Sequence, residues 1–191
     1  VTIWTEFSVK WYVELFKDEQ LMNAFYLSVK IASMTACMAL VLGTVAAYIL
    51  VKFGRFPGQA LFSSMIVAPL VMPEVITGLS LLLLFVGLND VLGWPSSRGA
   101  VTIWIAHVTF SVAFVTILIS SRLREMDGSL EEAAMDLGAP PLKVFFVITL
   151  PLIMPALISG WLLAFTLSLD DLVIASFVSG PGSSTLPMVI Y

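Results

Sequence analysis

The sequence predicts an all-α membrane protein, and three observations point to that class. Hydrophobic residues make up 59% of the 191-residue chain and charged residues only 12%, whereas a soluble domain carries roughly 25% charged residues. The apolar residues lie in long runs separated by short polar loops. Four runs are as long as the roughly 20 residues that a helix needs to cross a bilayer: about 21–50, 59–87, 100–121 and 142–169. We therefore treat residues 1–191 as one multi-span helical domain.

The composition also excludes several classes of function. The chain has one Cys and one His, too few for a disulfide framework or a metal site built from these residues. No Lys/Arg cluster is longer than the pair Arg122 and Arg124, which argues against a nucleic-acid partner. No Gly-rich loop followed by Lys and Ser or Thr occurs, so we expect no nucleotide site and no cofactor in this chain.

The two ends of the chain are predicted to differ from the four spans. Residues 1–20 combine Trp4, Trp11 and Tyr12 with several charged side chains, a pattern typical of an amphipathic segment at the membrane surface. After a turn-rich loop, residues 186–191 are apolar again and are the possible start of a further span. Because the chain does not begin with Met, we expect it to be part of a longer one.

Two of the spans contain paired prolines, Pro69 with Pro73 and Pro151 with Pro155. Proline removes an i→i−4 hydrogen bond and kinks a helix, and in lipid the freed carbonyl must find a partner in a neighbouring helix or a wet cavity. The pairs therefore predict kinked helices that line a neighbouring helix surface or a cavity. The alternative is the generally higher frequency of Pro in membrane helices.

The connecting loops set the expected orientation, because positive residues stay on the cytoplasmic side. Most Lys and Arg residues of the connecting loops follow the first and third spans: Lys52, Arg55, Arg122, Arg124 and Lys143. The opposite side is mainly acidic. We therefore place loops 51–58 and 122–143 in the cytoplasm and both ends of the chain outside it.

The loop between the third and fourth spans predicts a short polar helix. Ser129 and Glu132 have the spacing of a capping box, so the helix is expected to begin near Leu130. Gly138 suits the left-handed residue that follows a helix, and Pro140 prevents continuation. A helix of about two turns needs tertiary contacts to be stable. It is either a docking element for a protein in water or a simple connector.

The spacing within this loop favours docking. The loop contains Glu132-Ala-Ala-x-x-x-Gly138 and, after nine residues, Ile148-x-Leu-Pro151. The pattern resembles the EAA loop of permease subunits of binding-protein-dependent ABC importers. The resemblance implies the MetI-like type I permease fold, in which the loop, here about 128–142, forms a coupling helix that sits in a groove of the ATP-hydrolysing subunit. It implies an ATPase-coupling site made of Glu131, Glu132, Ala133, Ala134, Asp136 and Gly138.

Two further stretches, Ala68–Leu79 and Leu167–Phe177, resemble the spermidine/putrescine permeases within that family. Members have six spans, so the first and last are expected to be missing here. The resemblance implies a bacterial inner-membrane protein that works with a second homologous permease, a dimer of ATPase subunits and a periplasmic solute-binding protein. ATP and Mg²⁺ are then expected on the ATPase, which makes this chain a non-catalytic subunit. A polyamine is the expected substrate, with another small solute as the alternative.

Other classes of protein fit the sequence less well. A secondary transporter needs ion sites at the membrane midplane and usually internal repeats, but Glu74 is the one strong acid within a predicted span and no paired repeat is evident. A membrane enzyme needs His, Cys, Ser or carboxylate groups clustered at one depth. The single His and the single Cys give that class little support.

Four residues are candidates for the substrate pathway. Glu74 lies in the middle of the predicted second span, where a carboxylate is costly unless a cation or water satisfies it; the alternative is a protonated acid bonded between helices. Asp170 and Asp171 form either an acidic entry for a cation or an ordinary solvated helix end. Trp161 is an aromatic contact for an ammonium group or a packing residue. His107 is expected to bond another helix.

Overall fold

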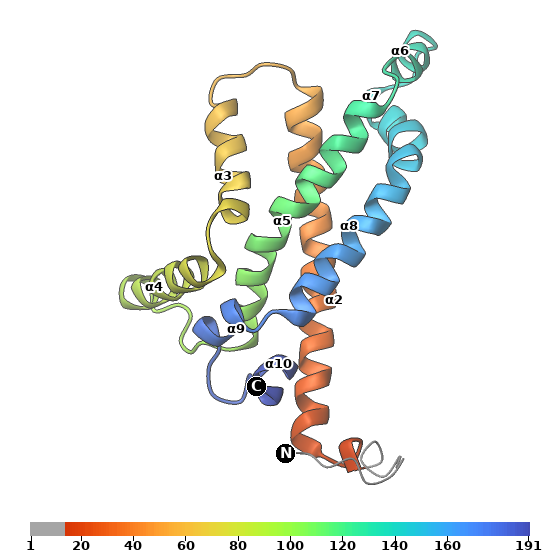
Figure 1. Cartoon of the computed structure of the whole chain (residues 1–191). Helices are drawn as coiled ribbons and strands as arrows, with labels where there is room; N and C mark the ends of the chain where they lie inside the picture. The colour runs from red at the N-terminus through yellow and green to blue at the C-terminus, as the bar shows by residue number, and fades with distance from the viewer. Residues whose placement is uncertain (1–13) are drawn as a thin grey trace.

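The computed structural model describes residues 14–191, which form a bundle around three long helices (Figure 1). These are α2 (Glu19–Lys52), α5 (Ala100–Glu125) and α8 (Leu150–Asp170). They pack against one another, and no β-strand occurs within the described range. The first 13 residues of the predicted surface segment 1–20 lie outside the described residues.

Helix α2 is the central element of the bundle. Its 34 residues correspond to about 51 Å at 1.5 Å per residue, longer than the roughly 30 Å hydrocarbon core. Asp18 caps its start, since Asp18 Oδ1 accepts a hydrogen bond of 3.1 Å from the Leu21 N–H. Glu19 in the first turn and Lys52 in the last complement the helix dipole. The helix is thus closed by polar groups at both ends.

A stripe of small residues brings α2 close to its neighbours. The buried members of this stripe are Ala32, Ala36, Ala39, Gly43, Ala46 and Ala47. A Cβ added at Gly43 would lie 2.7 Å from Val115 Cγ1 and 3.2 Å from the backbone N of Thr116. Helices in lipid associate through such close packing, because the lipid is as apolar as the side chains.

The range 59–87, predicted as one span, contains two helices, α3 (Gln59–Val71) and α4 (Glu74–Leu92). Met72 is extended with ψ 136°, the conformation favoured before a proline, and Pro73 is the N-cap of α4. Figure 1 shows α4 turned away from the direction of α3. The proline pair does disturb the helix, but the prediction of a continuous span is wrong. Of these two helices, only α4 is long enough to be a candidate membrane span.

The chain forms a polar corner between α5 and α8. It contains α6 (Ser129–Asp136), α7 (Pro141–Val144) and a π-helical turn, η1 (Phe145–Thr149), which runs directly into α8. The π-turn closes with the Leu150 N–H bonded to Phe145 O, just before Pro151, which has no N–H to continue the ladder. Residues 141–170 therefore form one continuous helical segment. This candidate membrane span begins and ends within one residue of the predicted span 142–169.

Two short helices, α9 (Val173–Val178) and α10 (Leu186–Ile190), lie at the opposite end of the bundle from α6 (Figure 1). α9 packs against α4 and α5, where Phe85, Ile103 and Ile174 share one buried cluster. α10 lies against α2, because the Leu186 N–H donates to Ser28 Oγ over 2.7 Å.

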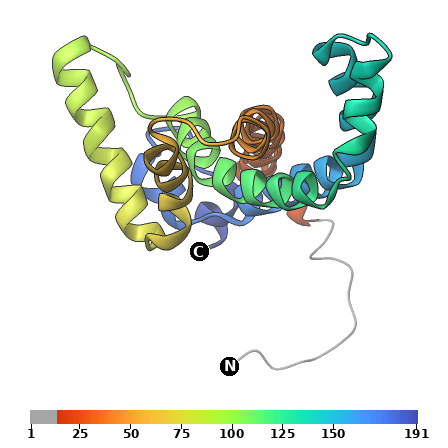
Figure 2. The same ribbon diagram turned by 90° about the horizontal axis from the view of Figure 1, so that it is seen from above.

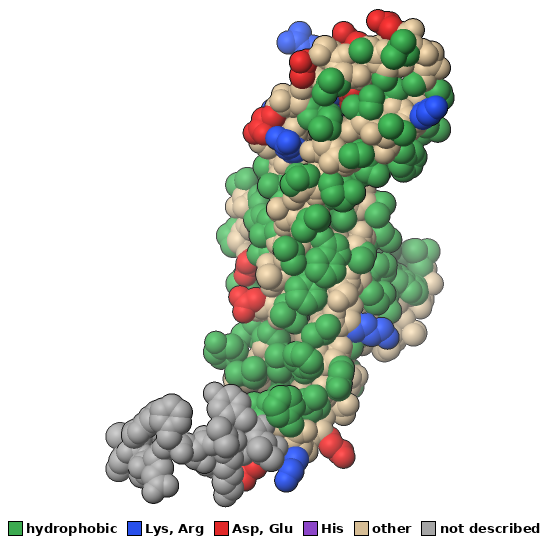
Figure 3. Space-filling view, turned by 90° about the vertical axis from the view of Figure 1, so that its right-hand side faces the viewer, with side chains coloured by type: hydrophobic (Ala, Val, Ile, Leu, Met, Phe, Trp, Pro, Cys, Tyr) green, Lys and Arg blue, Asp and Glu red, His purple; other side chains and the backbone are tan. Residues whose placement is uncertain are grey.

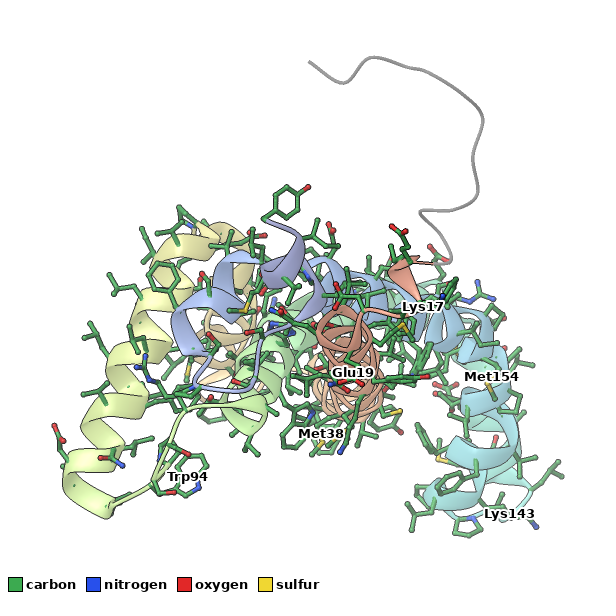
Figure 4. The ribbon with its side chains drawn as sticks, turned by 90° about the horizontal axis from the view of Figure 1, so that it is seen from below. Lys17, Glu19, Met38, Trp94, Lys143 and Met154 are labelled. Carbon is green, nitrogen blue, oxygen red and sulfur yellow. The ribbon has the colours of Figure 1, made fainter. Side chains whose placement is uncertain are left out.

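The elements splay into two wings around α2. Figure 2 shows α4 on one side and the α6 to α8 corner on the other, with α2 between them. In the view from below (Figure 4), Trp94 after α4 and Lys143 in α7 lie on opposite wings. The two wings therefore lie on either side of α2.

Candidate functional site

The polar end of the bundle is built around α6. In the space-filling view, charged side chains gather at this end and hydrophobic side chains dominate the middle of the molecule (Figure 3). The pattern is that of a protein whose middle lies in lipid and whose α6 end lies in water.

The start of α6 differs from the predicted capping box. Ser129 lies inside the helix, and the N-cap residue is Gly128, which has no side chain to accept a hydrogen bond. Asp127 takes the capping role instead, with its Oδ1 accepting a hydrogen bond of 3.0 Å from the Ser129 N–H. The backbone and hydroxyl of Ser129 both bond this carboxylate and lower the pKa of Asp127. The expected reciprocal pair of Ser129 and Glu132 is therefore wrong.

Glu131 fastens α6 to the rest of the bundle. Its Oε2 lies 2.6 Å from Lys52 Nζ at the end of α2, and its Oε1 accepts a hydrogen bond of 2.5 Å from Thr149 Oγ1 in η1. Burial raises the pKa of Glu131, but the hydrogen bonds from Lys52 and Thr149 and the charge of Lys52 outweigh it, so the pKa is lowered overall. Glu131, predicted among the docking residues, thus faces the bundle.

The remaining coupling residues lie on or near the surface. Glu132, Ala133, Asp136 and Gly138 are exposed, and Ala134 is half-buried. Gly138 has φ +85°, the left-handed conformation predicted for the helix exit.

Sequence reasoning missed two leucines at this end. Leu137 is 90% exposed and Leu142 is 75% exposed, one on each side of the turn at Gly138. Exposed apolar side chains surrounded by polar groups are typical of protein interfaces. For Leu137 the available signal was an apolar residue outside any predicted span, whereas Leu142 lies at the first position of the predicted span 142–169 and gave no such signal.

An acidic hollow lies at the opposite end of the bundle. Its volume is about 810 Å³. Residues from several elements line it, among them Glu74, Phe110, Asp170, Asp171, Pro187 and Tyr191. It therefore brings together three of the four predicted pathway residues.

Glu74 and Asp170 are exposed at the surface of this hollow. Neither has a hydrogen-bonding or ionic partner within residues 14–191. Glu74 was expected in the middle of a span, but the break before it places it in the first turn of α4. A carboxylate there is favoured by the helix dipole.

Asp171 is bonded within the protein. Its Oδ1 accepts from the Ile174 N–H at 3.2 Å, and its Oδ2 accepts from the Ala175 N–H at 2.8 Å. The same Oδ2 lies 3.0 Å from His107 Nε2. Asp171 therefore caps α9 and anchors His107, which makes the interhelical hydrogen bonds expected of it.

Trp161 lies away from the hollow. Its ring stacks on Phe165 with centroids 5.3 Å apart, and its Nε1–H donates to Cys37 Sγ over 3.3 Å. It lines a separate apolar groove with Leu40 and Leu157. The geometry fits the packing alternative for Trp161.

Metal ligands do not cluster in the part of the chain that the structure describes. No group of three or more His, Cys, Asp or Glu side chains is arranged to hold a metal ion there. The two candidate sites are the exposed face of α6 at one end and the carboxylate-lined hollow at the other.

Comparisons with known proteins agree with this architecture. The helical membrane bundle has the fold of the MetI-like ABC permeases. A solved amino acid ABC transporter with histidines has the same fold, with a TM-score of 0.63 at 18% identity over 96% of this chain and 80% of that chain. The family model of the binding-protein-dependent transport system inner membrane component matches residues 39–191. The chain belongs to this family, as its sequence predicts, and is an integral membrane permease subunit.

The sequence is also similar to two permeases whose substrates are named. The chain is 67% identical to the putrescine transport system permease protein PotI of Escherichia coli (strain K12), over 100% of this chain and 68% of that protein. It is 41% identical to the spermidine/putrescine transport system permease protein PotC of Haemophilus influenzae, over 98% of this chain and 70% of that protein. The predicted resemblance to polyamine permeases is confirmed.

Proposed function

We propose that this chain forms half of the translocation pathway of an ATP-driven importer for polyamines, with putrescine as its main cargo. The observation that carries the cargo assignment is the acidic hollow, in which the carboxylates of Glu74 and Asp170 have no partner among the described residues. The high identity to a putrescine permease supports the same substrate class.

The hollow suits a flexible dication. Glu74 belongs to α4 and Asp170 to the end of α8, so one ammonium group at each carboxylate would bridge two elements of the pathway. The apolar surface between them, including Phe110 and Pro187, suits the methylene chain of a diamine. A neutral or anionic solute would leave both carboxylates without a counter-charge, so a cation is the favoured occupant of the hollow.

The α6 end is the proposed docking site for an ATPase subunit. ATP and Mg²⁺ bind that partner. The movement that ATP hydrolysis drives there reaches this chain through the exposed face of α6. Glu131 passes the movement on, because it holds both Lys52 of α2 and Thr149 next to α8. The complete importer contains a second homologous permease, an ATPase dimer and a periplasmic solute-binding protein.

The proposed topology follows from the same division of the molecule. Loops 51–58 and 122–143 face the cytoplasm, where the ATPase is found. The acidic hollow faces the periplasm, where the binding protein delivers its cargo.

The cargo assignment is tested by Glu74→Gln in the reconstituted complex. Loss of one charged contact costs about 1.5–3 kcal/mol, so we expect KM for putrescine uptake to rise about tenfold or more. Asp90→Asn is the matched control, because Asp90 is also exposed on α4 but does not line the hollow. Unchanged uptake by Glu74→Gln would remove the hollow from the pathway.

The coupling assignment is tested by Glu132→Lys. Reversal of charge on the exposed face of α6 should abolish substrate-stimulated ATP hydrolysis and uptake, while the isolated permease still inserts. Glu125→Lys, at the same end of the molecule but outside α6, should retain most of the activity. Normal coupling in the Glu132 variant would refute docking through this face.

Two alternatives are separated by simple measurements. If another small solute and no polyamine stimulates ATP hydrolysis by the complex, the cargo is that solute. If uptake proceeds without ATP and follows an ion gradient, the chain is part of a secondary transporter.

A further inference from the structure

We infer that His107 is a positioning residue that sets the separation between the two substrate carboxylates, and through it the length of diamine that the pathway accepts. The inference rests on the proposed polyamine function. It starts from a buried hydrogen-bonded chain, Ser168–His107–Asp171, which lies against the hollow and which substrate contact alone does not explain.

The imidazole of His107 is 2% exposed and has a partner at each nitrogen. Nδ1 lies 2.7 Å from Ser168 Oγ and Nε2 lies 3.0 Å from Asp171 Oδ2. A carboxylate accepts hydrogen bonds, so we assign the proton to Nε2, and Nδ1 then accepts from the Ser168 hydroxyl. Both ring nitrogens are satisfied, as a buried imidazole requires.

These two bonds bracket Asp170. Ser168 lies two residues before Asp170 and Asp171 directly follows it, so one ring on α5 fixes the last turn of α8 on both sides of the substrate carboxylate. Asp170 itself makes no bond among the described residues. Its direction is therefore set by the backbone that His107 holds.

The hydrogen bonds of His107 and Asp171 also act on α4, the helix that carries Glu74. Asp171 caps α9 through Ile174 and Ala175, and α9 presses on α4 one turn beyond Glu74. A Cβ added at Gly78 would lie 2.8 Å from Phe177 Cδ2 and 3.4 Å from Ile174 Cα. Close packing of this kind leaves α4 little freedom relative to α9.

His107 therefore connects both carboxylates to one helix, α5. Asp170 is held through the end of α8, and Glu74 is held through Asp171, α9 and Gly78. Without the imidazole, Asp170 and Glu74 are no longer held to the same helix, and the distance between their carboxylates becomes variable. A rigid pair of carboxylates discriminates between diamines of different length, whereas a loose pair adapts to each of them.

The experiment uses the complete reconstituted importer and three α,ω-diamines with three, four and five carbons. KM and kcat are measured for each diamine through substrate-stimulated ATP hydrolysis. His107→Leu is expected to lower the selectivity, measured as the ratio of kcat/KM between the best diamine and its neighbours, by about fivefold or more. His107→Gln, whose amide offers one donor and one acceptor, is expected to restore much of that ratio.

Thr116→Val is the control for general destabilisation of α5. Thr116 is also buried, but its hydroxyl bonds Val112 O in its own helix over 2.7 Å. This variant should reduce stability without changing the selectivity ratio.

An unchanged ratio in His107→Leu would overturn the inference. If that variant does not assemble, Ser168→Ala decides in its place, since it removes one of the two bonds: a reduced ratio supports the inference and an unchanged ratio overturns it. Failure of the proposed function is a separate result, in which the wild-type complex responds to none of the three diamines.

Discussion

Glu131 determines how the polar end is attached to the bundle, because its side chain reaches two elements at once. Its carboxylate is 13% exposed and pairs with Lys52, which is 21% exposed. Charged hydrogen bonds of this kind contribute about 1.5–3 kcal/mol. Glu131→Gln should therefore loosen α6 without unfolding the spans.

The measurement is amide hydrogen exchange over residues 129–136 of the detergent-solubilised complex. We expect exchange in α6 to accelerate by about tenfold or more in Glu131→Gln. Glu125→Gln, which changes an exposed carboxylate at the same end of the molecule but outside α6, should leave it nearly unchanged. Equal protection in the two variants would show that Glu131 does not fasten α6.

The attachment of α6 should also depend on pH. The pKa of Glu131 is lowered from its ordinary value of 4.5, so its contribution to stability is complete above that value and disappears as the pH falls through the lower, folded-state pKa. The protection factors of the α6 amides, corrected for the slower intrinsic exchange at low pH, should therefore fall in this acid range in the wild type. In Glu131→Gln this fall should be weaker, because the titrating group is absent.

Element packing depends on positions where a helix has no room for a side chain. Gly43→Val would place a Cβ 2.7 Å from Val115 Cγ1, against the backbone of α5. Overpacking costs about 1–3 kcal/mol, so we expect a lower unfolding temperature. Gly87→Val on α4 is the control, since no atom lies within 4 Å of the added Cβ. Equal melting of both variants would contradict tight α2 to α5 packing.

The helices also show which parts of the fold can be predicted from the sequence. Hydropathy and length locate three of the four spans, because lipid imposes both requirements locally. The break at Met72–Pro73 was missed, since a proline pair fits either a kink or a break, and contacts such as that of Gly78 with Phe177 arise far away in the chain. The pairing of Glu131 with Lys52 spans 79 positions, beyond the reach of any local motif.

The candidate site was predictable to a different degree at each end. The spacing around Glu132 and Gly138 identified the polar helix, because that signal is local. At the acidic hollow the sequence supplied the three carboxylates but not their roles, which depend on partners. Asp171 is engaged by His107 and by α9, whereas Glu74 and Asp170 are not, and only the folded arrangement distinguishes them.

The whole molecule has two different ends, and its orientation in the membrane is testable. With Cys37 replaced by Ser, a cysteine at Ser96 should react with a membrane-impermeant thiol reagent added from the periplasmic side. A cysteine at Asp127 should react only after the inner membrane is permeabilised. The reverse pattern would invert the proposed topology.

The break before α4 allows α3 and α4 to move relative to each other. α3 has no buried residue, whereas α4 buries Thr77, Gly78 and Phe85. We therefore expect a displacement of loop 51–58 to move α3 more than α4, because the extended Met72–Pro73 link separates the two helices. We expect Glu74 to keep its orientation while the half of the molecule that carries α6 moves, so that the proposed contact with the cargo is preserved.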